Sequence, residues 1–236
     1  MTNAAIKVGI SSCLLGQAVR YDGGHKRSAL CMDELARLFD LVPTCPEAGA
    51  GLGVPRPAVQ LRGDALAPRA VGVEDARVDV TEQLQAYARR RMPELAELCG
   101  YVFIRNSPSC GLVDVKLHDA HGRLREETSR GIFAEAFVRA HPLLPVEEEG
   151  RLQDPVLRNS FITRVFALHE WRQLQKAGSG AAAISEFHAR YTNTVMARSP
   201  AQHHELERML RDAGNDLAAL GERYIAALLA ALRPGA

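Results

Sequence analysis

Three of the five cysteines in this chain are placed where they could bind a metal together. Cys13 follows the segment KVGISS, Cys45 follows LVPT and Cys110 follows YVFIRNSPS, and each segment is predicted to form a β-strand. The carboxyl ends of strands in an open α/β sheet lie along one edge, so we expect the three thiols to meet there. Three thiolates fit a [4Fe–4S] cluster with one iron left open, or a zinc site completed by histidine or water. The spacing does not choose between them.

The other two cysteines are expected to pack in the core. Cys31 and Cys99 lie inside or at the end of predicted amphipathic helices, where a free cysteine behaves as a small hydrophobic residue. The chain contains no CxxC motif, which argues against a zinc ribbon and against a thioredoxin-type dithiol. An odd number of cysteines without an export signal also makes a disulfide framework unexpected.

Groups suited to acid–base chemistry and hydrogen bonding accompany two of the three cysteines. Glu47 follows Cys45 by two residues in CPEAGAGLGVPRP, and Ser107 and Ser109 precede Cys110 in NSPSCG. Glu47 places a carboxylate near the second cysteine, and both hydroxyls are suited to orienting a substrate or water. Serine, proline and glycine also cluster in ordinary turns, which is the alternative interpretation of the NSPSCG segment.

Candidate substrate contacts lie in the same segments. Asp22 and Lys26 belong to RYDGGHKR, shortly after the first cysteine, and Asp-Gly-Gly is first of all a turn signal. A solvated loop is therefore the alternative for both residues. The predicted substrate-binding residues are Ser12, Asp22, Lys26, Arg56 and Ser109.

The elements that must position these residues alternate between β-rich and helical patterns up to about residue 149. The predicted strands cover residues 6–11, 38–44, 76–81, 101–106, 113–119 and 143–149. Helices are predicted over residues 28–40 and 81–99, the second with a kink at Pro93, and a hairpin over residues 113–128. This alternation predicts an α/β fold with a mainly parallel sheet flanked by helices.

The remainder of the chain is predicted to be a small all-helical segment. Asp154 and Pro155 form a helix start signal, and the first helix is expected to stop at Gly178. Further helices are predicted over residues 179–198 and 200–232. We therefore divide the chain into an α/β domain, residues 1–150, and a helical part, residues 151–236.

Bulk properties limit the classes of function. The net charge of +1 and a pI near 7.7 give no overall case for nucleic acid, although residues 151–236 have a modest excess of positive charge. No segment reaches the roughly 18 apolar residues of a membrane span, and no leader is apparent. We expect a cytoplasmic protein that does not bind membranes, and the sequence leaves its oligomeric state open.

The three cysteine-containing segments SSCLLGQAVRYDGGHKR, CPEAGAGLGVPRP and NSPSCG together resemble the iron–sulfur-dependent thiouracil desulfidase family. This resemblance spans about residues 5–150. It implies a [4Fe–4S] cluster on Cys13, Cys45 and Cys110 that takes the sulfur of a thiolated pyrimidine while water replaces it on carbon. It also implies that Glu47 serves as the general base and that Ser107 orients water or substrate.

The segment from DPVLRNSFITR to FHARYTNTVMARSP resembles the start of a helical domain in desulfidases that act on 4-thiouridine in transfer RNA. This resemblance implies a transfer RNA substrate, and a free thiouracil base or nucleoside is the alternative. Two other classes of function stay open. One is a metal-binding or redox-sensing protein without catalysis, and the other is an RNA-binding adaptor that acts through its helices.

Overall fold

The computed structural model describes residues 5–213 and 217–234, which fall into two compact units. The first unit extends to Gln153 except for Leu143–Pro145, and the second contains that short segment and the residues from Asp154 onward. Among the described residues, no helix has the length and apolar character needed to cross a membrane.

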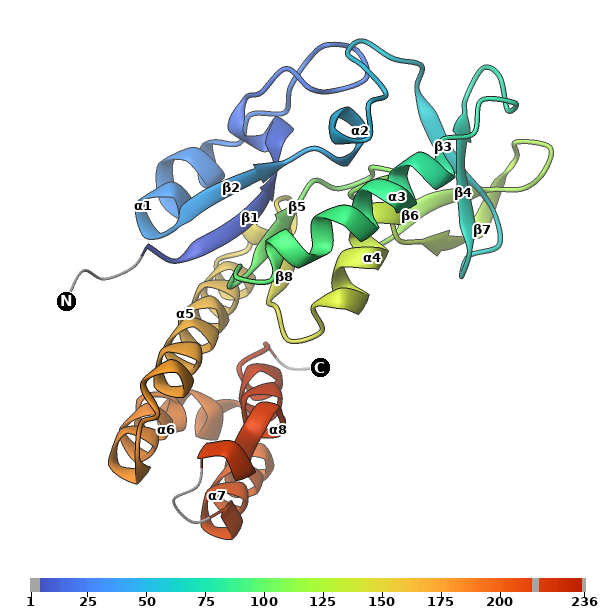
Figure 1. Ribbon diagram of the computed structural model, residues 1–236. Helices are drawn as coiled ribbons and strands as arrows, with labels where there is room; N and C mark the ends of the chain where they lie inside the picture. Colours follow the sequence, from blue (N-terminus) through green and yellow to red (C-terminus); the bar gives the residue numbers. More distant parts are fainter. Residues whose placement is uncertain (1–4, 214–216, 235–236) are drawn as a thin grey trace. The chain divides into compact units, whose positions relative to one another are not determined.

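A four-stranded parallel sheet organises the first unit (Figure 1). Its strand order is β2 (Asp40–Thr44), β1 (Lys7–Ser11), β5 (Tyr101–Phe103) and β8 (Val146–Glu148). The register pairs the last residue of β1, Ser11, with the last residue of β2, Thr44, so these two strands end at the same level. The predicted α/β fold with a mainly parallel sheet is confirmed.

Aromatic side chains fill the space beside this sheet. Tyr101 and Phe103 of β5 stack with ring centroids 4.2 Å apart, and Phe137 lies 4.7 Å from the Tyr101 ring. The Tyr101 ring also covers Gly9 of β1, where a Cβ atom would lie 2.2 Å from the ring. Gly9 therefore permits the close contact that brings β1 and β5 together.

A second four-stranded sheet has mixed strand directions. Its order is β4 (Pro68–Gly72), β3 (Val59–Gly63), β6 (Val115–His118) and β7 (Leu124–Ser129). The predicted hairpin is confirmed as the antiparallel pair β6–β7, but the antiparallel pair β3–β4 was not predicted. The strand predicted over residues 76–81 is wrong, because that segment forms only an isolated bridge between Val71 and Asp79.

Short helical segments connect the strands of the first unit. They are η1 (Ser12–Leu15), η2 (Leu30–Leu35), α1 (Ala36–Leu38), α2 (Pro46–Gly49), α3 (Thr81–Arg91), η3 (Met92–Leu95), α4 (Ile132–Ala140) and η4 (Arg151–Gln153). The predicted helix over residues 28–40 begins with a π-helical turn. The one over residues 81–99 becomes 3₁₀-helical around Pro93, which lacks the N–H for an α-helical hydrogen bond.

The described residues of the second unit form the helices α5 (Pro155–Ala177), α6 (Ala181–Arg198), α7 (Pro200–Ala213) and α8 (Leu217–Ala231). The Asp154 carboxylate accepts a hydrogen bond from the Val156 N–H, and Gly178 ends α5 with φ 60°, as predicted. The continuous helix predicted over residues 200–232 is wrong at Gly221, whose φ and ψ are not helical, and its residues 214–216 lie outside the described chain.

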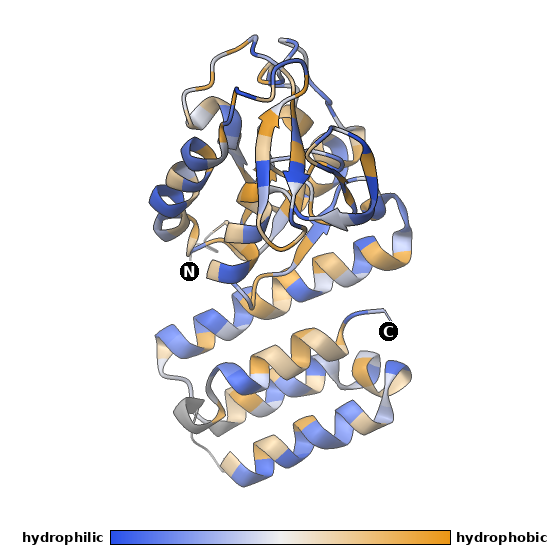
Figure 2. Cartoon of the chain, turned by 90° about the vertical axis from the view of Figure 1, so that its right-hand side faces the viewer, coloured by the Kyte–Doolittle hydropathy of each residue, from blue (hydrophilic) through white to orange (hydrophobic). Residues whose placement is uncertain are grey.

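The core of the helical unit is aromatic. The Trp171 ring lies 5.6 Å from Phe187 and 5.2 Å from Tyr224, measured between centroids, and all three side chains are buried. Figure 2 shows hydrophobic and hydrophilic residues alternating along these helices, as amphipathic packing requires.

Candidate active site

The three cysteines follow three neighbouring strands and line one cavity of about 280 Å³. Cys45 comes directly after β2, Cys13 lies in η1 two residues beyond β1, and Cys110 lies in the loop after β5. All three are free thiols. The matched ends of β1 and β2 and the adjacent position of β5 bring residues from distant parts of the sequence to the same edge of the sheet.

These thiols are poorly accessible to solvent and affect one another electrostatically. Burial raises the pKa of Cys13 to about 11, with a further contribution from Cys45. Burial also raises the pKa of Cys110 well above its usual range, and Cys45 adds to this effect. The pKa of Cys45 is raised by burial too, while the backbone N–H of Ala48 opposes the shift. A bound cation would favour the thiolate form of all three.

The three thiols of the cavity are compatible with an iron–sulfur cluster. In the described part of the chain, no three His, Cys, Asp or Glu side chains are grouped as the ligands of one metal ion. A [4Fe–4S] cluster binds each cysteine through a different iron atom and so requires thiols spread around a cavity. The three soft sulfur donors on the wall of one cavity match this requirement.

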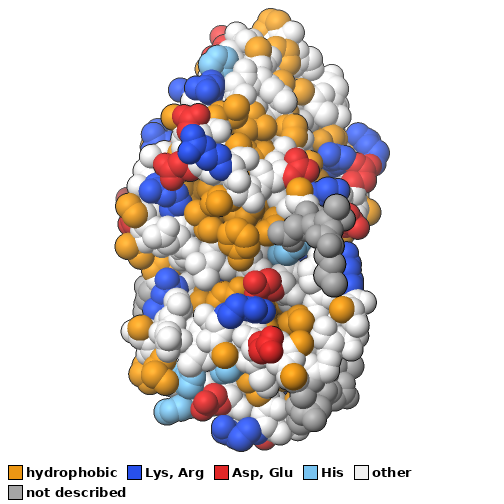
Figure 3. All heavy atoms as spheres, turned by 90° about the vertical axis from the view of Figure 1, so that its left-hand side faces the viewer, with side chains coloured by type: hydrophobic (Ala, Val, Ile, Leu, Met, Phe, Trp, Pro, Cys, Tyr) orange, Lys and Arg blue, Asp and Glu red, His pale blue; other side chains and the backbone are white. Residues whose placement is uncertain are grey.

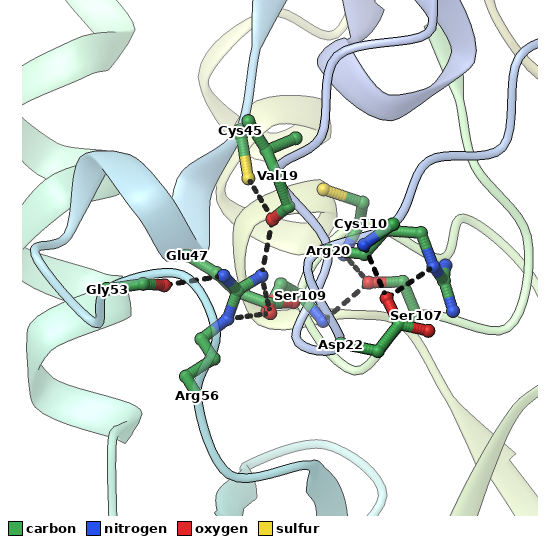
Figure 4. A network of polar contacts seen from close by, with 11 residues as sticks. Val19, Arg20, Asp22, Cys45, Glu47, Gly53, Arg56, Ser107, Ser109 and Cys110 are labelled. Carbon is green, nitrogen blue, oxygen red and sulfur yellow. Dashed lines mark hydrogen bonds and ion pairs between the residues drawn. The ribbon is translucent and has the colours of Figure 1, made fainter.

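A buried ion pair stands at the wall of the same cavity (Figure 4). The Glu47 Oε2 atom accepts hydrogen bonds from Arg56 Nε at 2.8 Å and lies 2.6 Å from Arg56 Nη2. The same guanidinium donates to the backbone oxygens of Gly53 at 2.8 Å and Val19 at 2.9 Å. These contacts orient Glu47 and join the first two cysteine loops, and Arg56 also lines the cavity.

Ser107 organises the third cysteine loop. Its Oγ atom accepts hydrogen bonds from the backbone N–H groups of Ser109 at 3.2 Å and Cys110 at 3.0 Å. The Ser107 side chain also lines the cavity, where its hydroxyl hydrogen remains available for donation. Ser109 differs, because its side chain is fully buried and does not belong to the cavity wall.

The remaining predicted contacts divide into two groups. Ser12 lines the cavity, whereas Asp22 and Lys26 do not. The Asp22 carboxylate accepts a hydrogen bond from the Gly24 N–H at 2.9 Å, which lowers its pKa. The backbone N–H of Lys26 donates to the Cys13 carbonyl, so this segment supports the cysteine loop while the Lys26 side chain is exposed.

Sequence reasoning missed two groups that lie close to the thiols. Arg20 lines the cavity, and its positive charge opposes the rise in the pKa of Cys13. Ser11 also lines the cavity, and its hydroxyl opposes the rise in the pKa of Cys110. Arg20 precedes Asp22 by two residues, so the basic loop RYDGGHKR held the signal without showing which side chain faces inward.

Cys31 and Cys99 are buried and do not line the cavity. Cys31 lies in η2, where its backbone N–H donates to the Ser28 hydroxyl oxygen. Burial raises the pKa of its thiol to about 11.

The chain is thus an α/β protein with a parallel sheet. Loops after neighbouring strands of this sheet place three thiols and a carboxylate around one cavity. The sequence profile of the 2-thiouracil desulfurase family matches residues 8–149, and the chain belongs to this family.

A solved structure described as the [4Fe–4S]-dependent thiouracil desulfidase TudS is similar to this chain, with 28% identity and a TM-score of 0.51. The match covers 66% of this chain and 98% of that one. No curated protein sequence matched the chain.

Proposed function

We propose that the chain is an iron–sulfur-dependent desulfidase that replaces the thiocarbonyl sulfur of a thiolated pyrimidine with oxygen. The observation that carries this proposal is the cavity lined by Cys13, Cys45 and Cys110 with Glu47 on its wall. Membership of the desulfurase family and the similarity to an iron–sulfur-dependent desulfidase support it. In this proposal the three cysteines hold a [4Fe–4S] cluster, which when bound supplies an iron that accepts the soft thiocarbonyl sulfur.

Glu47 is the proposed proton carrier. Its carboxylate lies at the cavity wall, where a water molecule can approach, and Arg56 fixes its orientation. Glu47 takes a proton from the attacking water and returns it to the departing sulfur or to the ring. One water is consumed and one sulfide released for each C=S group converted to C=O, so no electrons are needed from outside.

Ser107 and Ser12 are the proposed positioning groups for substrate and water. Both line the cavity, and the Ser107 oxygen is held by two backbone N–H groups while its hydrogen can point toward a ligand. Arg20 provides a positive charge at the same wall. The buried Ser109 hydroxyl has no access to a ligand in this arrangement.

We further propose that residues 1–150 form the catalytic domain and that residues 151–236, as the start of a helical domain, bind transfer RNA that carries 4-thiouridine. The proposal rests on the sequence resemblance of the helical segment. Several of its arginines are paired with carboxylates, including Arg190 with Glu170 and Arg208 with Glu205. Basic and acidic side chains are also mixed on the face of the molecule shown in Figure 3. A free thiouracil base or nucleoside is accordingly the second substrate class to be tested.

The test is anaerobic reconstitution followed by assay of sulfide release from a thiouracil, 4-thiouridine and transfer RNA containing 4-thiouridine. The wild type should contain iron and sulfide and release sulfide from at least one substrate. Cys13→Ala should lose the cluster and the activity, and Glu47→Gln should keep the cluster and lose the activity. Cys31→Ala is the matched control, because it removes a buried cysteine away from the cavity.

The other classes of function predict different results. A protein that only stores or senses a cluster would bind iron without releasing sulfide. An RNA-binding adaptor would bind transfer RNA in a salt-dependent manner even after loss of the cluster. Full activity of Cys13→Ala would overturn the ligand assignment.

A further inference from the structure

Three consecutive carboxylates, Glu147, Glu148 and Glu149, stand at the end of β8. This strand completes the parallel sheet beside β5 but contributes no cysteine. Glu147 and Glu148 are buried, which is unusual for carboxylates and requires specific partners. Their contacts differ from one residue to the next, and two of the three reach the cysteine loops.

Glu148 holds the segment that follows Cys110. Its Oε1 atom accepts hydrogen bonds from the backbone N–H groups of Leu112 at 2.8 Å and Val113 at 3.2 Å. Leu112 and Val113 lie in the loop between β5 and β6, where no strand pairs with them. The Glu148 carboxylate therefore supplies the acceptor for their backbone N–H groups. The Arg130 guanidinium secures the same turn by donating to the Leu112 carbonyl at 3.0 Å.

Glu149 reaches the segment that follows Cys13. Its Oε1 atom accepts a hydrogen bond of 2.6 Å from the Ser28 hydroxyl, and the Ser28 N–H donates to the carbonyl of Leu14, the residue after Cys13. The backbone N–H of Glu149 donates to the Phe103 carbonyl, which anchors the carboxylate at the end of β5. Glu148 and Glu149, which are adjacent in sequence at the end of β8, therefore connect this strand with the loops that follow Cys110 and Cys13.

Glu147 makes no such connection. Its Oε1 atom accepts hydrogen bonds from Arg151 Nε at 2.7 Å and from the adjacent Glu148 N–H at 3.1 Å. This residue shares the burial and the chemistry of Glu148 but contacts neither cysteine loop through the hydrogen bonds of its carboxylate. It is accordingly a matched control within the same sequence run.

We propose that Glu148 and Glu149 are positioning residues that fix the loops carrying Cys110 and Cys13, and so set the arrangement of thiols before a cluster binds. The fixing of the loops follows from the contacts above, and only its value for cluster binding rests on the proposed function. The strand without a cysteine thus supplies the supports for two of the three thiols.

The first measurement needs no cluster. In the reduced protein without iron, the rate of alkylation of Cys110 by iodoacetamide is followed by mass spectrometry at the peptide level. Removal of one acceptor leaves two backbone donors unsatisfied, so Glu148→Ala should raise the labelling rate of Cys110 by about tenfold or more. Glu148→Gln keeps an oxygen that can accept both bonds and should stay within about twofold of wild type.

Controls separate loop fixing from general destabilisation. Glu147→Ala should leave Cys110 labelling unchanged, and Cys31 in the Glu148→Ala protein should label at the wild-type rate. Ser28→Ala should increase labelling of Cys13 and not of Cys110. If Glu148→Ala fails to fold, Glu148→Asp replaces it, because the shorter side chain withdraws the carboxylate from the two donors while keeping the charge.

The second measurement is the iron and sulfide content and the visible absorption of the reconstituted proteins. Cluster content should fall in Glu148→Ala and recover in Glu148→Gln. The proposal would be overturned if Cys110 in folded Glu148→Ala were labelled at the wild-type rate. The same holds for Glu148→Asp if that replacement is used. If the wild type binds no cluster but Glu148→Ala still labels faster at Cys110, the fixing of the loop is supported. That pair of results would count against the proposed function instead.

Discussion

Replacement of Arg56 by methionine should lower the stability of the α/β unit, because the Glu47 carboxylate is left buried without its partner. The substitution keeps a chain of similar length but removes every donor that now contacts Glu47, Gly53 and Val19. The Arg56 and Glu47 side chains are only 4% and 14% exposed, so the carboxylate loses its partner in a place where water compensates poorly.

The expected cost follows from this burial. Removal of one partner of a buried ion pair costs about 3–5 kcal/mol, and the lower end applies here because Glu47 borders a cavity. About 3 kcal/mol corresponds to roughly a 100-fold increase in the fraction of molecules in which this part of the α/β unit is unfolded. In the double variant Glu47→Gln/Arg56→Met no charge is left unpaired, so the loss should shrink to about 1–2 kcal/mol.

Hydrogen exchange read by mass spectrometry suits this experiment because it reports on peptides of the α/β unit separately. Protection of β2 and the loop after it should fall by about 100-fold in Arg56→Met and recover by about 5- to 30-fold in the double variant. Peptides from α6 and α7 serve as the internal reference. A double variant at least as poorly protected as Arg56→Met would show that the two side chains are not coupled, and would refute the reasoning.

Two further predictions concern packing and titration. Gly131→Ala places a Cβ atom 2.6 Å from the Ser109 carbonyl, so we expect a loss of about 1–3 kcal/mol in urea denaturation, whereas Gly180→Ala, with open space around it, should lose far less. Equal losses would contradict this. The buried Cys31 thiol has its pKa raised from about 9 to about 11, so its contribution to stability is present below pH 9 and is lost as the pH rises from 9 to 11. Cys31→Ala should therefore show a shallower fall in unfolding free energy across that window, by up to about 1.4 kcal/mol per pH unit, and parallel curves for the two proteins would exclude this role.

The strands that carry the cysteines could be predicted because their apolar residues form short uninterrupted runs, as buried parallel strands do. The β3–β4 hairpin could not, since Gly63 at the end of β3 and Pro68 at the start of β4 are residues more typical of loops than of strands. The alternating pattern at residues 76–81 instead suggested a strand. Only tertiary pairing shows that this segment makes a single bridge.

Sequence position located the loops of the candidate site but not the direction of each side chain. Ser107 and Ser109 are two residues apart in one turn, yet one lines the cavity and the other is fully buried. The direction is set by the hydrogen bonds that the Ser107 oxygen accepts from the turn itself. The same limit applies to Arg56, whose guanidinium donates both to the nearby Gly53 carbonyl and to the Val19 carbonyl of a loop distant in sequence.

The aromatic core of the helical unit makes Trp171 a selective optical reporter. It is the only tryptophan in the chain, and it is buried between Phe187 and Tyr224. Light absorbed by indole is therefore absorbed by the helical unit alone, and a shift of its emission toward longer wavelength marks the exposure of that core to water. Unfolding can thus be followed in the helical unit without labels, while the α/β unit, which has no indole, must be observed by other means.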